Sequence, residues 1–293
     1  MDQEELRALV AQMLREMEGR PEPPVKAGEY KPALLPDSGT LPDITKIDLR
    51  QQYLTEQPAD PKGFLALKTR TPARLGVGRA GTRYKTSTLL RFRADHAAAQ
   101  DSVFSELPPD FAKANGLIPV KTMCRDKDEY LTRPDLGRRF DENMGALIRE
   151  TCKDAQVLLV IGDGLSSAAI TANALDCAAA IRQGLKGYGI EPPRSLCVQY
   201  CRVGASDHIG DLTGCALVCL LVGERPGLVT SESMSAYITY MPRRGIPESK
   251  RTVISNIHAQ GITAVEAGAH IAALMDTMLR QKASGIDLKV EQG

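Results

Sequence analysis

The chain has 293 residues, enough for one large or two modest domains, and a 43% hydrophobic content supplies a sizeable core. Lys and Arg total 37 against 36 Asp and Glu, so the net charge of +1 creates no bulk field to attract nucleic acid or an anionic membrane surface. Trp is absent, which argues against a base-stacking platform, and no apolar run is long enough to span a bilayer.

The seven cysteines include no CxxC motif, and no signal peptide is recognisable. This pattern is typical of small buried residues in a reducing, cytosolic compartment rather than of a disulfide or zinc framework. Cys197 and Cys201 are four residues apart in one strand-like run, as are Cys215 and Cys219 in another. Period-two geometry therefore predicts that each pair shares one face of its strand.

Residues 1–19 are predicted to form an amphipathic helix, because their apolar residues recur at helical spacing: Leu6, Leu9, Val10, Met13, Leu14 and Met17. Residues 20–43 are rich in proline and should form an extended linker. A lone short helix is marginal in water, so the apolar stripe should dock on something. The sequence leaves open whether that is another molecule or the chain's own domain.

Residues 44–115 are predicted to be mainly helical and rich in loops, with a dense basic cluster: Arg70, Arg74, Arg79, Arg83, Lys85, Arg91 and Arg93. Guanidinium groups on a glycine-rich backbone suit phosphate or the carboxylates of a partner. The segment GVGRAG at 76–81 is not a dinucleotide loop, because its third glycine comes one place early and no buried strand precedes it. A solvated basic face is the alternative, but the cluster should lack acidic neighbours of its own, so a protein interface is favoured.

From residue 116 to 293 the pattern becomes α/β. Strands are predicted at Gln156–Ile161, Ser195–Val203, from Ala216, and at Ala236–Met241, and helices at Ala168–Arg182, near Asp207–Gly214 and at Ala264–Ala283. Repeated strand–helix units predict a Rossmann-like, mostly parallel sheet flanked by helices.

The apolar run ALVCLLVGERPGL at 216–228 becomes charged where the strand should end, at Glu224 and Arg225. Ligands of open parallel sheets bind outside the carboxyl ends of the strands, so the segments at Asp163, Val203 and Glu224 should share one ligand-binding rim. Asp163 would be available there as an acceptor, beside the first amides of the following helix. The alternative is that residues 224–227 form only a turn with a surface ion pair. For a strand and turn considered in isolation, this alternative is favoured.

Several collinear segments carry a family resemblance: GRAGTR (78–83), LLRFRADHA (89–97), YLTRPDLGRR (130–139), DGLSSAAITAN (163–173), YCRVGASDHIGD (200–211), LLVGERPGL (220–228), SESMSAYITYMP (231–242), SNIHAQG (255–261) and QKASGIDL (281–288). Together they closely resemble the light (small) subunit of ethanolamine ammonia-lyase, from about residue 70 to the end.

The resemblance implies a subunit of an adenosylcobalamin-dependent enzyme that converts ethanolamine to acetaldehyde and ammonia by a radical mechanism. A heavy subunit with a TIM barrel holds the substrate and most of the chemistry, and the light chain completes the cobalamin site at their interface. Carried over to this sequence, the cobalamin contacts fall at Val203, Glu224 and Val253. The last position is commonly Cys in the family, so a backbone or shape contact is expected there.

The resemblance also implies that cobalamin binds with its own benzimidazole on cobalt, so this chain should supply neither a metal ligand nor a catalytic residue. Residues 256–261 differ from an Asp-x-His-x-x-Gly cobalt-ligand motif at the first position, and His258 is interpreted as a loop or helix-cap residue. Family enzymes are often packaged in a bacterial microcompartment, which favours residues 1–19 as a tag for its shell, within the bacterial cytoplasm.

Two functions from other classes compete with this interpretation. A nicotinamide-dependent dehydrogenase would need a complete GxGxxG after the first strand, and GDGLSS at 162–167 lacks it. A non-catalytic binding module or scaffold would bind no corrinoid.

Overall fold

The computed structural model describes residues 43–55, 58–191 and 193–289. The chain divides into two units, residues 1–43 and 44–293, and the second unit contains nearly all of the described residues. The predicted amphipathic helix at 1–19 and almost all of the predicted linker at 20–43 lie outside the described residues.

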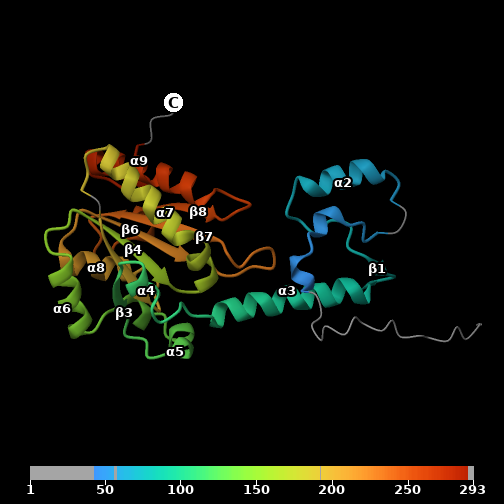
Figure 1. Cartoon of the computed structure of the whole chain (residues 1–293), viewed down its shortest axis with the longest axis horizontal. Coiled ribbons are helices and arrows are strands. Elements are labelled where there is room, and N and C mark those ends of the chain that lie inside the picture. The colour runs from blue at the N-terminus through green and yellow to red at the C-terminus, as the bar shows by residue number, and fades with distance from the viewer. Residues whose placement is uncertain (1–42, 56–57, 192, 290–293) are drawn as a thin grey trace, which may run out of the picture. The chain divides into compact units, whose positions relative to one another are not determined.

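The described helices and strands are shown in Figure 1. The α-helices are α2 (Pro61–Thr69), α3 (Thr86–Phe104), α4 (Phe111–Ala114), α5 (Lys127–Thr132), α6 (Glu142–Thr151), α7 (Ser167–Gly187), α8 (Ala205–Thr213) and α9 (Ala264–Gln281). The strands are β1 (Arg79–Ala80), β2 (Arg83–Tyr84), β3 (Ile118–Lys121), β4 (Val157–Asp163), β5 (Arg194–Gln199), β6 (Leu217–Gly223), β7 (Met234–Tyr240) and β8 (Arg251–Ile257). Short 3₁₀ turns lie at Ile44–Lys46, Leu49–Gln51, Leu136–Arg138, Glu248–Lys250 and Gly285–Asp287.

The core is a six-stranded sheet with the order β3-β5-β4-β6-β7-β8. The first four strands pair in parallel, whereas β7 runs antiparallel to both β6 and β8. The predicted α/β class and mainly parallel sheet flanked by helices are confirmed, and the pairings of β7 with β6 and β8 are the antiparallel exceptions. No helix separates β6 from β7, and a direct connection allows only an antiparallel neighbour, because parallel strands need a longer crossover.

Helices cover both faces of the sheet (Figure 1). Alternate residues of β4 point to opposite sides: Leu159 and Ile161 pack in one hydrophobic cluster with α7 and α9, and Leu158 and Val160 in another with α6 and α8. Every residue of β4 and β6 is buried. Burial on both faces explains why these strands are continuous apolar runs in the sequence.

Helix α7 begins at Ser167, at the pair of serines from which its start was predicted. The Ser166 hydroxyl accepts a hydrogen bond from the Ala169 amide at 3.1 Å and caps the helix. Thr263 caps α9 in the same way by accepting from the Glu266 amide at 3.4 Å. Among the described helices, none combines the length and apolarity that crossing a membrane requires.

All seven cysteines are buried and unbridged, as predicted, but the predicted pairing of faces was wrong. Cys197 and Cys219 pack in the hydrophobic cluster with α7 and α9. Cys201 and Cys215 pack in the cluster with α6 and α8, on the opposite face of the sheet. The alternation of strand side chains does not extend to residues 201 and 215, because β5 ends at Gln199 and β6 begins at Leu217. Tyr200 turns the chain with a φ of 58°.

The basic cluster of residues 44–115 does have an acidic partner, contrary to the prediction. Asp95 is buried on α3, and its carboxylate pairs with Arg74 at 2.7 Å and Arg91 at 2.9 Å. Arg91 also donates to the Thr45 and Ile47 carbonyls. These two arginines therefore hold this region together, whereas Arg93 is exposed.

Candidate functional site

The carboxyl ends of β4, β5 and β6 form a rim at the point where the strand order reverses. The chain leaves β4 through α7 to reach β5 on one side, whereas β6 lies on the other side of β4 and leads outward to β7. Such a switch point is the preferred ligand site of open α/β sheets. The predicted rim segments around Val203 and Glu224 meet here.

A cavity of about 150 Å³ opens at this rim. Its lining residues are Tyr130, Leu165, Cys201, Arg202, Val203, Val222, Gly223, Glu224, Arg225, Ser235 and Tyr237. The walls are mainly apolar, with Glu224 and two arginines as the charged groups. Such walls suit a ligand that is largely apolar and carries a few polar groups.

Glu224 is fixed by hydrogen bonds from its own chain. Its Oε1 accepts from the Ser235 hydroxyl at 2.5 Å and the Asn256 amide at 3.2 Å, and its Oε2 accepts from the Ser233 hydroxyl at 2.8 Å. Partial burial raises the pKa of this carboxyl, but the hydrogen bonds from Ser235, Ser233 and Asn256 outweigh that effect and leave the pKa below its ordinary value. The group is therefore a carboxylate at neutral pH.

This carboxylate retains capacity to bind a ligand. Two carboxylate oxygens offer about four acceptor positions. Three internal hydrogen bonds leave about one position open, on Oε2. Glu224 is therefore a fixed hydrogen-bond acceptor that can accept about one more hydrogen bond, from a ligand. The alternative interpretation of residues 224–227 as a surface turn with an ion pair fails for Glu224, which forms no ion pair among the described residues and instead binds β7 and β8.

Val203 and Val253 occupy different positions relative to the cavity. Val203 lines it directly and packs against the α6 and α8 cluster. Val253 lies on β8, 42% exposed, and pairs in register with Tyr237, which lines the cavity. Directly opposed residues of antiparallel strands share a face, so Val253 extends the same surface beyond the cavity.

The groups that hold Glu224 were not predicted from the sequence. Ser233 and Ser235 are two residues apart, and this spacing at a strand start puts both hydroxyls on one side. This spacing is visible in the sequence and could have predicted that both hydroxyls face Glu224. The hydrogen bond from the Asn256 amide could not have been predicted in this way, because it depends on a backbone turn with a φ of 59°.

Asp163, which was predicted to be available to a ligand at the rim, is not among the residues that line the rim cavity. It is buried, with Oδ1 accepting from the Ser167 hydroxyl at 2.6 Å and Oδ2 from the Leu107 amide at 3.2 Å. Burial raises the pKa of this carboxyl above its ordinary value. Asp163 therefore joins the start of α7 to the segment after α3, outside the rim cavity.

His258 lies in the loop after β8, as predicted. Its Nδ1 accepts from the Gln260 amide at 3.3 Å, within the tight turn that ends at Gly261. This contact is that of a loop-stabilising residue.

Replacement of Gly223 by Ala is expected to destabilise the chain by about 1–3 kcal/mol, because overpacking forces the backbone to shift. A Cβ at Gly223 would lie 2.3 Å from the Ser166 carbonyl oxygen, where β6 passes the start of α7. Urea unfolding measures the effect. Gly187→Ala is the control, since its Cβ would meet nothing within 4 Å. Equal stabilities of the two variants would contradict the prediction.

Comparison with known proteins identifies the family of this chain. Residues 61–289 match the family model described as ethanolamine ammonia-lyase light chain. The chain is 56% identical to the ethanolamine ammonia-lyase small subunit of Clostridioides difficile (strain 630), over 99% of this chain and 100% of that protein. It is 57% identical to the small subunit of Clostridium perfringens and 55% identical to that of Listeria innocua, with the same coverage. The chain belongs to the ethanolamine ammonia-lyase light-chain family.

Proposed function

We propose that this chain is the light subunit of an adenosylcobalamin-dependent ethanolamine ammonia-lyase, which converts ethanolamine to acetaldehyde and ammonia by a radical mechanism. Residues 116–293 would form its Rossmann-like cobalamin-binding domain, with Val203, Glu224 and Val253 as cofactor contacts. The observation that carries this proposal is the carboxylate of Glu224, fixed at the switch point of the sheet with one acceptor position open.

The residues of the rim fit part of a cobalamin molecule. A corrin ring carries carboxamide side chains on an apolar macrocycle, and the cavity combines a carboxylate acceptor with apolar walls. Glu224 would bind and orient a carboxamide N–H, and Val203 and Val253 would give shape contacts. When bound, adenosylcobalamin supplies the radical that starts the reaction, and the protein supplies position and exclusion of water.

The dimensions of the cavity favour a second chain in the site. Ligand pockets usually measure about 300–1,000 Å³. The rim cavity of about 150 Å³ therefore gives one wall for a cofactor as large as cobalamin. We infer that the heavy subunit, a TIM barrel, supplies the remaining wall and the substrate site, and that residues 44–115 contact it. Cobalamin would keep its own base on cobalt, with no metal ligand from His258 or the rest of this chain.

The decisive experiment is co-expression of this chain with the heavy subunit, followed by an acetaldehyde assay with and without adenosylcobalamin. We expect turnover only with both chains and the cofactor, and a corrinoid spectrum in the purified complex. A complex without that spectrum would favour a scaffold, and activity dependent on a nicotinamide would favour a dehydrogenase. Either result would reject the proposal.

We further propose that residues 1–19 direct the enzyme to the shell of an ethanolamine-utilisation microcompartment in the bacterial cytoplasm. Deletion of residues 1–19 is expected to leave lyase activity unchanged and to abolish co-purification with shells. The proposal is supported by the apolar stripe of this segment and by the proline-rich sequence after it. Quantification of the enzyme in purified shells measures the effect, and undiminished packaging of the deletion variant would reject the assignment.

A further inference from the structure

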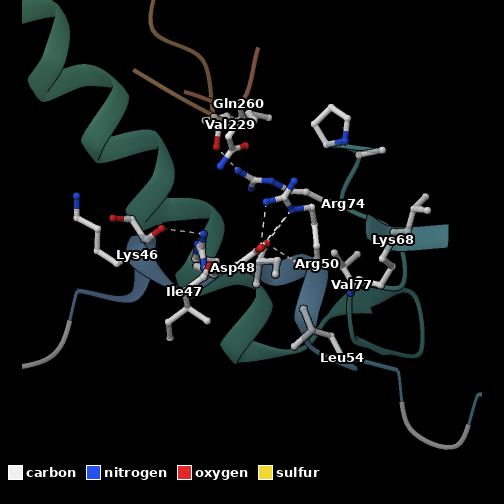
Figure 2. A pocket seen from close by; sticks show the side chains of 17 residues that line it. Lys46, Ile47, Asp48, Arg50, Leu54, Lys68, Arg74, Val77, Val229 and Gln260 are labelled. Atoms are coloured by element: carbon white, nitrogen blue, oxygen red, sulfur yellow. Dashed lines mark hydrogen bonds and ion pairs between the residues drawn. The ribbon is translucent and has the colours of Figure 1, made fainter. Parts of the chain in front are cut away.

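A second cavity, of about 200 Å³, lies apart from the rim and shares no lining residue with the rim cavity. Figure 2 shows its labelled side chains, which come from residues 46–77 and from Val229 and Gln260 in the later part of the chain. Five cations line it: Lys46, Arg50, Lys68, Arg74 and Arg91. The rest of the lining is largely apolar, with Thr45, Asp48 and Gln260 as the other polar residues.

Two of these cations are already neutralised. Arg50 forms a forked pair with Asp48, with its Nε and Nη2 each 3.0 Å from a carboxylate oxygen (Figure 2). Arg91 pairs with Asp95 at 2.9 Å, and Arg74 shares the same carboxylate at 2.7 Å. Two carboxylates thus face five cations, and the cavity keeps an excess of positive charge.

Lys68 is a buried cation on the wall of this cavity. Lys68 is only 2% exposed, and its ammonium donates a hydrogen bond to the Gln52 carbonyl at 2.6 Å. It forms no ion pair among the described residues. Burial lowers the pKa of this group, and the charge of Asp48 only partly offsets that effect. A buried ammonium has three donors and is costly without a counterion, so Lys68 retains donors for an anion.

Arg74 adds a second unsatisfied donor. Its Nη2 binds Asp95 and the Leu228 carbonyl, and its guanidinium stacks over Phe92 with its carbon 4.7 Å from the ring centre. Its Nη1 is buried and has no hydrogen-bond partner. Buried polar groups are nearly always paired, so an unpaired guanidinium nitrogen beside a cationic cavity marks a place for an acceptor.

We propose that this cavity binds a small oxyanion of the phosphate class, held by Lys68 and Arg74. A phosphate carries up to two negative charges and several acceptor oxygens, which matches the excess charge and the unsatisfied donors. The lining is a concave space walled by chain segments far apart in sequence, which suits a compact anion better than an extended acidic peptide. The site is independent of the proposed cobalamin rim.

The test uses the full chain co-purified with its heavy subunit and titrates inorganic phosphate by isothermal calorimetry, with chloride as the background anion. We expect one phosphate to bind per light chain. Lys68→Met should weaken binding about tenfold or more, because a hydrogen bond to a charged group contributes about 1.5–3 kcal/mol. Arg74→Lys keeps a cation for Asp95 but removes the buried, unpaired Nη1 donor, so it should weaken binding in the same direction and guards against misfolding of the Lys68 variant.

Arg93→Gln is the matched control, because Arg93 is an exposed cation of α3 outside the cavity lining. It should bind phosphate like the unaltered protein. The proposal is overturned if the complex binds no phosphate, which would also be the result if an acidic side chain of the heavy subunit fills the cavity. It is equally overturned if Arg93→Gln weakens binding as much as Lys68→Met does.

Discussion

Replacement of Glu224 by Gln is expected to weaken cobalamin binding by the two-subunit complex about 10- to 100-fold, since a hydrogen bond to a charged group contributes about 1.5–3 kcal/mol. The carboxylate is surrounded by donors: the hydroxyls of Ser233 and Ser235 and the amide of Asn256. A carboxamide in its place brings two N–H donors into that shell. It must either lose an internal hydrogen bond or present a donor where the ligand also presents one.

Visible absorption titration of the complex with cobalamin measures this effect directly. Glu232→Gln is the matched control, because Glu232 belongs to the same β6–β7 connection and is exposed. The control should bind cobalamin normally, so that any loss at position 224 cannot be attributed to net charge. Equal affinities of the Glu224 and Glu232 variants would remove Glu224 from the cofactor site and leave the rim without its principal polar contact.

The lowered pKa of Glu224 gives this contact a definite pH dependence. Its ordinary pKa is 4.5, and the hydrogen bonds from Ser235, Ser233 and Asn256 hold the folded value below that. A group with a depressed folded pKa contributes stability above its ordinary pKa and loses it as the pH falls through the folded value. The contribution of Glu224 to cobalamin affinity should therefore stay constant from neutral pH to about 4.5, and decline only in more acidic solution.

The parts of the fold that follow from local rules could be predicted from sequence. The apolar run of β4, the glycine turn after it and the serine that caps α7 each express a rule that acts within a few residues. The place of Glu224 at the rim also followed from such a rule, because the end of its strand is visible where apolar residues stop, whereas the strand predicted to reach Val203 ends at Gln199.

The remaining features depend on contacts between distant residues. The direction of β7 depends on what connects it to β6, and a strand's own residues do not show that. The pairing of Arg74 with Asp95 joins a loop to the middle of α3, so the basic cluster looked uncompensated in sequence. The position of Val253 beside Tyr237 required the strand register, which the antiparallel order of β7 and β8 sets.

Substitution of Asp207 by Asn is expected to destabilise the chain by about 3 kcal/mol, the lower end of the range for breaking a buried ion pair, because Arg251 then keeps an ion pair only with the largely exposed Glu248. The Arg251 side chain is only 2% exposed and forms a forked pair with Asp207, at 2.7 and 2.8 Å. Burial lowers the pKa of this guanidinium, but its hydrogen bonds to Asp207 and Glu248 raise it well above the ordinary value. Arg251 therefore stays charged in the variant and cannot avoid the cost of a buried charge by losing its proton.

This pair joins two parts of the proposed cobalamin site. Asp207 lies on α8, in the turn after Val203, and Arg251 lies on β8, two residues before Val253. Thermal unfolding of Asp207→Asn should show a midpoint lower by roughly 10 °C, since about 2–4 °C is lost per kcal/mol in domains of this size. Asp276→Asn breaks an ion pair with the largely exposed Arg280 and should change stability by less than about 1 kcal/mol. If both variants unfolded at the same temperature, the buried pair would not be what holds Val203 and Val253 on one surface.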